Sequence, residues 1–341
     1  MGVDEQVRDE GGFARDGITL GGVSISEDGF WGGLTILPVL FLYLLIAILP
    51  VGFALYASLH RIPLTQPEWT FVGLQNYFEV FRLDRFWGSM WRGTVFMVGS
   101  TLVQLAVGLW MAMVINRMDR GQRLLSTFVF TSYLIPTIIV TLIALFMLDP
   151  FVGVLHEFGT SLGLWNNYVL GAATGGIPII GGFALTIPGD LFTLKIPSEF
   201  SLALPAVVLI GSWKFSVFVT IFALAQLRSI PDRFYEAAKI CGATSWEMFR
   251  DITLPRLKGA ILVAVLLRSV FMFNKYDIIW HLTQGGPGYE TTTMPILAYR
   301  ETFESSAYGL GNAIAVVMFC FLAVGAVAYF LAFNPSQEVD T

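Results

Sequence analysis

Charged side chains are scarce in this chain. Asp, Glu, Lys and Arg together make up 13% of its 341 residues, whereas apolar residues make up 55%. A soluble domain carries about a quarter charged residues, so this sequence has too few to cover a water-exposed surface. The mean hydropathy of +0.69 points the same way. The composition therefore excludes a pair of ordinary soluble domains and predicts an integral membrane protein.

Cysteine and histidine are also rare, which argues against several kinds of site. The two cysteines, Cys241 and Cys320, fall in different expected environments and indicate neither a disulfide framework nor a metal cluster. The three histidines, His60, His156 and His281, are scattered at the edges of apolar runs, and no nucleophile is paired with a base. The net charge of −5 excludes a polybasic surface for nucleic acid. We expect no metal site, no catalytic residue and no nucleic-acid partner.

Two further absences concern classes of transporter. The sequence has no G-x-x-x-x-G-K-[ST] segment to cradle phosphates, so the chain is not expected to be its own ATPase. It also has no internal repeat with paired interrupted helices, which a secondary transporter would be expected to show. A secondary transporter or channel is therefore the weaker alternative.

The N-terminal stretch, residues 1–30, holds seven carboxylates against two arginines and is rich in glycine. It lacks the basic start and the small-residue cleavage site of a signal peptide. We expect a flexible acidic tail here, and a second short tail at residues 336–341.

Six apolar runs are each long enough to cross a bilayer as a helix, which takes about 20 residues. They are residues 31–59, 94–115, 124–148, 202–227, 260–282 and 309–333. These runs predict an all-α membrane protein with six transmembrane helices, contained in a transmembrane domain at residues 31–335.

Basic residues gather in two of the loops between these runs. One loop contains Arg117, Arg120 and Arg123, and the other, residues 228–258, contains six cations. Cytoplasmic loops carry an excess of Lys and Arg, so both loops are expected to lie inside. The chain is then a multi-pass protein of the plasma or inner membrane with both termini in the cytoplasm.

An insert at about residues 149–200 contains one more apolar segment, Tyr168–Ile187. Five glycines and Pro178 interrupt it, and that density disfavours a lipid-exposed helix. A seventh span would also place the two basic loops on opposite sides of the membrane. We therefore expect an external loop that partly dips into the membrane.

The loop at residues 228–258 has the pattern of two short helices around a turn. Pro231 suits the first turn of a helix, and either Ser229 or Asp232 is able to cap it. Gly242 permits a tight turn after that helix.

The second helix of this loop is expected at residues 245–251. Thr244 and Glu247 fit a capping box at its start. The pair Leu254 and Pro255 is expected to end it before the fifth span begins. An amphipathic hairpin on the membrane surface would account for the caps, but not for the small side chains that gather on one face.

Those small residues belong to a recognisable pattern. It consists of E-A-A, three residues, G, nine residues and I-x-L-P, which resembles the EAA loop of permease subunits of ATP-binding-cassette (ABC) importers. The residues that fill it are Glu236, Ala237, Ala238, Gly242, Ile252, Leu254 and Pro255. The segments Phe71–Tyr77 and Leu282–Pro287 also resemble blocks of carbohydrate permeases. The resemblance covers about residues 35–333 and leaves out the acidic tail and the glycine-rich insert.

The resemblance implies a type I ABC importer permease fold of the maltose-permease-like, binding-protein-dependent family. In that fold a cytoplasmic coupling helix between spans four and five docks on a separate ATPase. The implied partners are a second permease subunit in a heterodimer, an ATPase dimer, an external solute-binding protein and the lipid bilayer. No cofactor is expected on this chain, because ATP and Mg would bind to the partner ATPase.

Polar groups inside membrane spans are costly and are therefore candidates for function. Three residues share a face of the fourth run and three recur at i, i+4 and i+7 in the fifth. They are Lys214, Phe215, Phe218, Arg268, Met272 and Lys275. In the resemblance these positions correspond to those that contact sugar in maltose-type permeases, although cationic and apolar residues here replace small polar ones. An alternative is that Lys214, Arg268 and Asp277 pair with one another or with carbonyls to fix helix packing.

The expected substrate is a mono-, di- or oligosaccharide, because aromatic faces stack on sugar rings and polar groups bond their hydroxyls. The three cations of the proposed site keep a second possibility open, namely glycerol-3-phosphate or another small polar solute.

Overall fold

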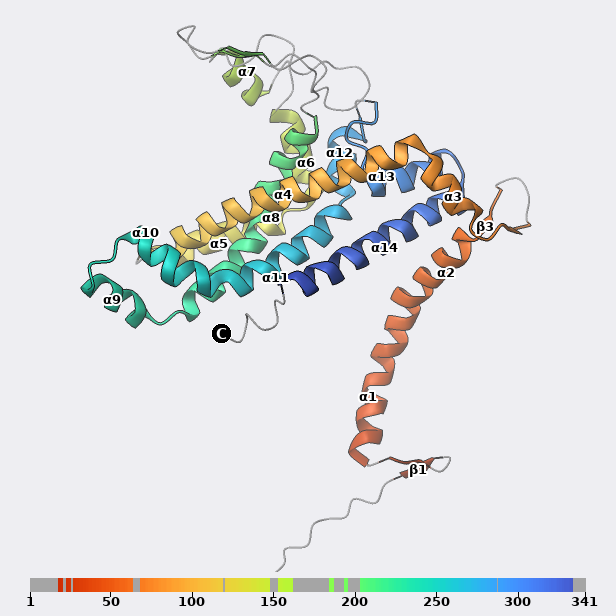
Figure 1. The fold of residues 1–341 in the computed structure, drawn as a ribbon, viewed down its shortest axis with the longest axis horizontal. Coiled ribbons are helices and arrows are strands. Elements are labelled where there is room, and N and C mark those ends of the chain that lie inside the picture. The colour runs from red at the N-terminus through yellow and green to blue at the C-terminus, as the bar shows by residue number, and fades with distance from the viewer. Residues whose placement is uncertain are drawn as a thin grey trace, which may run out of the picture. The chain divides into compact units, whose positions relative to one another are not determined.

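The computed structural model describes residues 18–20, 23–25, 27–63, 68–118, 120–147, 153–161, 184–186, 193–195, 203–286 and 288–333 (Figure 1). The chain divides into two compact units, Met1–Tyr56 and Ala57–Thr341. Each unit is described below by itself.

The first unit contains a short hairpin and one long apolar helix. Strands β1 (Ile18–Leu20) and β2 (Val23–Ile25) pair antiparallel, with Thr19 opposite Ser24. The helix follows as α1 (Glu27–Tyr43), a π-helical turn η1 (Leu44–Ile48) and α2 (Leu49–Ser58).

Part of the predicted flexible tail, at residues 18–30, therefore contains a hairpin and the start of the first helix. The reason lies in two alternating apolar and polar triplets, I-T-L and V-S-I, which two glycines separate in the sequence. This pattern is typical of a hairpin. The first helix also begins four residues before residue 31, at Glu27. Residues 1–17 of the predicted tail, and the whole predicted tail at 336–341, lie outside the described residues.

Apolar helices that are candidate membrane spans, or parts of one, dominate the second unit. They are α4 (Asp84–Asn116), α5 (Gln122–Leu134), α6 (Thr137–Met147), α8 (Ala203–Ser229), α11 (Leu254–Phe273), α12 (Asp277–Thr283) and α14 (Tyr308–Phe333). Across both units, the described residues contain four helices long and apolar enough to cross a membrane, Thr35–Ser58 among them, and two bent pairs. If each pair is one span, the total is six, which agrees with the predicted number.

The two bent pairs were not foreseen. Helices α5 and α6 meet at 94°, and the segment Ser245–Phe273 meets α12 at 46°. The first bend falls at Pro136, whose ring disfavours a helical conformation at Ile135. The second bend falls at residues 274–276, between α11 and α12. The predicted third and fifth spans are therefore each broken rather than straight.

Helices α4, α8 and α11 pack against one another and form the centre of this unit (Figure 1). Glycine permits the close approach of α4 to α8. A Cβ atom added at Gly108 would lie 2.6 Å from Cβ of Val219 and 2.7 Å from the carbonyl oxygen of Ser216. Small residues allow two membrane helices to approach in this way.

Shorter elements cover one end of the spans. They are β3 (His60–Arg61), β4 (Thr70–Phe71), α3 (Gln75–Arg82), α13 (Met294–Tyr299) and the π-helical η3 (Arg300–Glu304). The side-chain amide of Asn76 donates to the carbonyl oxygens of Ser58, at 2.7 Å, and His60, at 3.0 Å. The block Phe71–Tyr77 therefore ties α3 to the segment at residues 58–60.

Part of the predicted external insert is also described. It contains α7 (Val154–Ser161) and the antiparallel strands β5 (Ala184–Thr186) and β6 (Thr193–Lys195). Most of the glycine-rich segment predicted to be a loop, residues 168–183, lies outside the described residues.

Candidate functional site

The loop at residues 228–258 folds as two helices around a turn, as predicted. Helix α9 (Asp232–Ile240) is followed by Gly242 at φ +80° and by α10 (Ser245–Met248). We call residues 232–253 the EAA hairpin. The glycine is required because a positive φ strains residues that carry a Cβ atom.

A capping box starts the second helix, as predicted. The backbone N–H of Glu247 donates to Oγ1 of Thr244 at 3.3 Å, and the backbone N–H of Thr244 donates to Oε2 of Glu247 at 2.7 Å. The hydrogen bond from the backbone N–H of Thr244, and after it the bond from the side chain of Thr244, hold the pKa of the Glu247 carboxyl below its ordinary value.

Two local predictions about this loop are wrong. Pro231 is the N-cap of α9 and no side chain caps the helix, because the hydroxyl of Ser229 bonds to the carbonyl of Gln226 and Asp232 is already the first helical residue. Nor does the chain break at Leu254 and Pro255.

The helix instead continues through a π-helical segment, η2 (Phe249–Thr253), into α11. The backbone N–H of Leu254 bonds to the carbonyl oxygen of Phe249, five residues back. This wider turn carries the chain past the ring of Pro255, which has no N–H to donate and lies in the first turn of α11. One bent helix therefore joins the hairpin to the fifth span.

The surface of the EAA hairpin presents small and apolar residues to solvent. Glu236, Ala237 and Gly242 are exposed, and nothing lies within 4 Å of where a Cβ of Gly242 would be. Two large apolar side chains beside them are also exposed, Ile240 by 88% and Trp246 by 67%. The sequence reasoning missed these two, although apolar residues in an otherwise polar segment are a readable signal.

The remaining predicted coupling residues behave differently. Ala238 is half-buried, and Leu254 and Pro255 are exposed at the base of the hairpin. Ile252 packs on a core cluster that includes Leu227 and Leu257. The structure thus gathers part of the predicted set on an open surface and assigns Ile252 to the packing beneath it.

Specific contacts fasten α9 to the start of α11. The hydroxyl of Tyr235 bonds to that of Thr253 at 3.0 Å. The guanidinium of Arg256 lies over the ring of Phe234, 4.0 Å from its centre. Two side-chain pairs therefore join α9 to η2 and to the first turn of α11.

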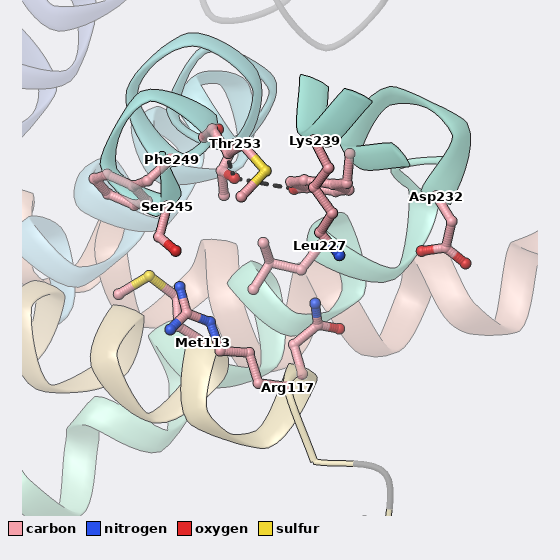
Figure 2. A pocket seen from close by; sticks show the side chains of 11 residues that line it. Met113, Arg117, Leu227, Asp232, Lys239, Ser245, Phe249 and Thr253 are labelled. Atoms are coloured by element: carbon pink, nitrogen blue, oxygen red, sulfur yellow. Dashed lines mark hydrogen bonds between the residues drawn. The ribbon is translucent and has the colours of Figure 1, made fainter. Parts of the chain in front are cut away.

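A cavity of about 470 Å³ lies behind the EAA hairpin. Met113 and Arg117 from the end of α4 line one side, and Lys239 and Ser245 line the other (Figure 2). The cavity therefore separates part of the hairpin from the end of α4.

The six residues proposed to contact substrate come together between α8 and α11. Cations surround the ring of Phe215, with Nζ of Lys275 at 4.4 Å from its centre, Cζ of Arg268 at 5.2 Å and Nζ of Lys214 at 5.3 Å. The guanidinium of Arg268 also lies 5.2 Å from the ring of Phe218. We call this group the Phe215 cluster: Lys214, Phe215, Phe218, Arg268, Met272 and Lys275.

The sequence left open the alternative that Lys214, Arg268 and Asp277 pair with one another or with carbonyls. The structure agrees with this alternative only in part. Nε of Arg268 donates to the side-chain carbonyl oxygen of Gln104 at 2.7 Å, and Nζ of Lys214 donates to the hydroxyl of Thr137 at 3.1 Å. Asp277 forms an ion pair with Lys275 at 3.0 Å.

Each of these charges therefore has its own partner, and Lys214, Arg268 and Asp277 do not pair with one another in the described structure. Sequence reasoning missed Gln104 and Thr137. An amide in the middle of an apolar run was the signal for Gln104.

Burial separates the members of the Phe215 cluster into two groups. Arg268 and Met272 are 2% exposed and Lys214 is 4% exposed. Phe218 and Lys275 are half-buried. Phe215, at 7% exposed, belongs with the buried members, whereas Phe218 and Lys275 keep part of their surface open.

The chain belongs to the family described as "Binding-protein-dependent transport system inner membrane component", whose model matches residues 104–333. The family and the apolar helices identify a multi-pass permease subunit of the ABC importer class.

Two of the similar proteins carry the names of sugar permeases. The trehalose/maltose transport system permease protein MalF of Thermococcus litoralis is 33% identical over 298 residues, which cover 87% of this chain and 92% of that protein. The trehalose transport system permease protein SugA of Mycobacterium tuberculosis is 31% identical over 301 residues, covering 87% of this chain and 86% of that protein.

The fold is also found in a solved structure. A chain of a bacterial ABC transporter involved in the import of the acidic polysaccharide alginate matches with a TM-score of 0.68 at 22% identity, covering 91% of this chain and 95% of that chain. The predicted type I ABC importer permease fold is therefore confirmed.

Proposed function

We propose that this chain is the permease half of an ATP-driven importer that carries a sugar inward. The observation that carries the proposal is the EAA hairpin, an open helical surface joined by one continuous helix to the Phe215 cluster. The trehalose and maltose permeases among its relatives support sugar as the cargo.

The EAA hairpin would be the docking surface for a separate ATPase. Ala237 and Gly242 present little bulk to a partner, Glu236 adds an exposed carboxylate, and Ile240 and Trp246 supply exposed apolar anchors. Such anchors, once buried against a partner, carry most of the binding energy of an interface.

Movement of the ATPase would then reach the substrate site mechanically. The contacts of Tyr235 with Thr253 and of Arg256 with Phe234 join α9 to the base of α11. The same helix carries Arg268 and Met272 farther along. A shift of the hairpin would therefore alter the spacing of α8 and α11 around the Phe215 cluster, which is how alternating access would be driven.

The proposal implies an assembly. It would comprise this chain, a second permease subunit, an ATPase dimer and an external solute-binding protein in the cell membrane, with both termini of this chain in the cytoplasm. ATP and Mg would bind to the ATPase, and this chain would bind no cofactor and catalyse no reaction.

The partners of the three cations favour a neutral sugar over an anionic solute. Arg268 is engaged by Gln104, Lys214 by Thr137 and Lys275 by Asp277. Asp277 neutralises Lys275, whereas Arg268 and Lys214 bond to uncharged groups but are only 2% and 4% exposed, so an anion such as glycerol-3-phosphate would have to reach buried cations. A sugar instead needs an accessible aromatic face and hydroxyl partners, and Phe218 offers the face.

Reconstituted uptake tests this proposal. The complete transporter in proteoliposomes is supplied with ATP, its binding protein and either trehalose, maltose or glycerol-3-phosphate. We expect ATP-dependent uptake of a sugar and none of glycerol-3-phosphate. Uptake of glycerol-3-phosphate alone would reject the sugar assignment, and uptake without ATP would reject the importer.

A further inference from the structure

A second cavity lies between α8 and α11, apart from the Phe215 cluster. Its volume is about 400 Å³, which is within the range of small-molecule sites. Phe222, Ala225 and Gln226 line it from α8, and Arg256, Gly259 and Val263 line it from α11.

A ring contact joins this cavity to the Phe215 cluster. The rings of Phe218 and Phe222 lie 4.8 Å apart and are tilted by 33°. Phe218, Phe222 and Ala225 succeed one another at spacings of four and three residues, so they form one stripe along α8. The stripe leads from the accessible member of the cluster directly into the cavity.

The lining has the chemistry of a carbohydrate site. Phe222 supplies an aromatic face against which the C–H groups of a sugar ring can lie, and Gln226 supplies both a donor and an acceptor for hydroxyl groups. Gly259 and Ala225 add little bulk, which keeps the space open.

Arg256 connects the cavity to the EAA hairpin. Arg256 lines the cavity, and its guanidinium lies over the ring of Phe234 on α9, 4.0 Å from the ring centre. Any displacement of α9 that moves Phe234 therefore changes the wall of the cavity. The cavity lies on the side of the Phe215 cluster nearest the hairpin, where a solute moving inward would arrive next.

We propose that this cavity is a second station for the transported carbohydrate, reached from Phe218 across the ring of Phe222 and released when the EAA hairpin moves Arg256. The inference rests on the proposed sugar import and adds to it the route after the first site. A surface for the second permease subunit or for lipid is the competing use of the same space.

Cysteine protection tests the station. Cys241 and Cys320 are replaced by serine, and Ala225→Cys is introduced into the complete transporter in inside-out vesicles. A membrane-impermeant maleimide should label this cysteine, and maltose or trehalose, whichever the parent takes up, should slow labelling several-fold. Arg123→Cys, at an exposed position outside the cavity, is the control and should react at the same rate with and without sugar.

Either of two results overturns the station. If sugar leaves the labelling rate of Ala225→Cys unchanged, no carbohydrate occupies the cavity. If Ala225→Cys is never labelled while Arg123→Cys is, the second permease or lipid fills the space.

Transport of a ring variant gives an independent readout. Phe222→Ala should lower the amount of sugar taken up per ATP hydrolysed several-fold, and Phe222→Tyr should restore it. Phe330→Ala, at an exposed ring of α14, should behave as the parent does. If the parent takes up no sugar, the proposed function is rejected. If the parent transports sugar and Phe222→Ala takes up as much sugar per ATP hydrolysed as the parent does, only the station is rejected.

Discussion

The EAA hairpin and the Phe215 cluster differ in how exposed their main side chains are and in how far apart in the sequence their contacting residues lie. In the hairpin, large apolar residues such as Trp246 and Ile240 are exposed, and the contacts described lie within the hairpin and its base, including the Thr244–Glu247 capping box. In the cluster, Arg268 is buried, and its partner Gln104 is 164 residues away on another helix.

Under the proposed function, this difference separates two tasks of the chain. A surface that must receive a partner exposes its apolar anchors and needs only local order beneath them. A site that must hold helices in register around a passage needs long-range polar pairs, because in the membrane few other forces fix one helix against another. Substitutions should therefore affect assembly in the first region and folding in the second.

The largest effect should come from breaking the Gln104–Arg268 pair. Gln104→Leu removes the acceptor of Nε in a buried guanidinium, which keeps its contacts with Tyr133 and with Sδ of Met272, and should lower the free energy of unfolding by about 1–3 kcal/mol. Arg268→Met should cost a similar amount, and the double variant should cost clearly less than the sum. Denaturation of the purified permease in mixed micelles measures all three.

Asn274→Leu is the control for that series. Its amide is exposed at the end of α11 and bonds only to the carbonyl of Val270 among the contacts described, so the cost should stay below about 0.5 kcal/mol. Equal losses for Asn274→Leu and Gln104→Leu would remove the distinction between the two regions.

Trp246→Ala should weaken ATPase binding by about 10- to 30-fold, as the loss of a large anchor typically does. Because this side chain is 67% exposed, the stability of the isolated permease should not change. Titration of the purified ATPase onto the detergent-solubilised permease pair measures the affinity. Phe303→Ala, at a ring that is 61% exposed on η3, is the matched control and should bind normally. Unaltered ATPase affinity of Trp246→Ala would show that the ATPase docks elsewhere.

Gly242→Val should reduce ATP-driven uptake by about three- to tenfold, because a β-branched residue at φ +80° costs about 1–2 kcal/mol. Gly242→Asn should lose less, since asparagine tolerates this conformation. Uptake and permease stability are measured together. If Gly242→Val lowered the stability of the membrane spans and left ATP-driven uptake unchanged, the hairpin would not be ordered independently of the spans.

The sequence allowed the hairpin to be predicted well because its determinants are local. Gly242, Thr244 and Glu247 lie within six residues and specify a turn and a cap by their own chemistry. The continuous helix past Pro255 was not predictable in the same way, because a π-helical turn has no reliable signal in a single sequence. The bend at Pro136 was signalled by its proline, and the apolar run around it hid that signal.

For the Phe215 cluster, the sequence predicted only which residues share a helix face, and not which residues of other helices they contact. Helical spacing placed Arg268 and Met272 together, but not their neighbours on α4 and α6. Gln104 and Thr137 come from distant helices, and their pairing depends on the packing of α4 and α8 around Gly108 and on the bend before α6. Lys275 lies beyond the end of α11, so its contact with Phe215 depends on a break that periodicity does not reveal.

The smallest effect should come from the capping box, and its sign follows from the carboxyl of Glu247. The pKa of that carboxyl is lowered, so the stabilisation is complete above its ordinary pKa and is lost as the pH falls through the lowered value. Hydrogen exchange at the amide of Glu247 should therefore show protection that declines in acid. Thr244→Ala should abolish both the protection and its pH dependence, whereas Thr244→Ser should keep both. Because this box orders only one turn of an exposed helix, the exchange rates of amides in α8 and in α11 around Arg268 should not change with it. If those rates change together with the rate of Glu247, the hairpin and the Phe215 cluster are not ordered independently.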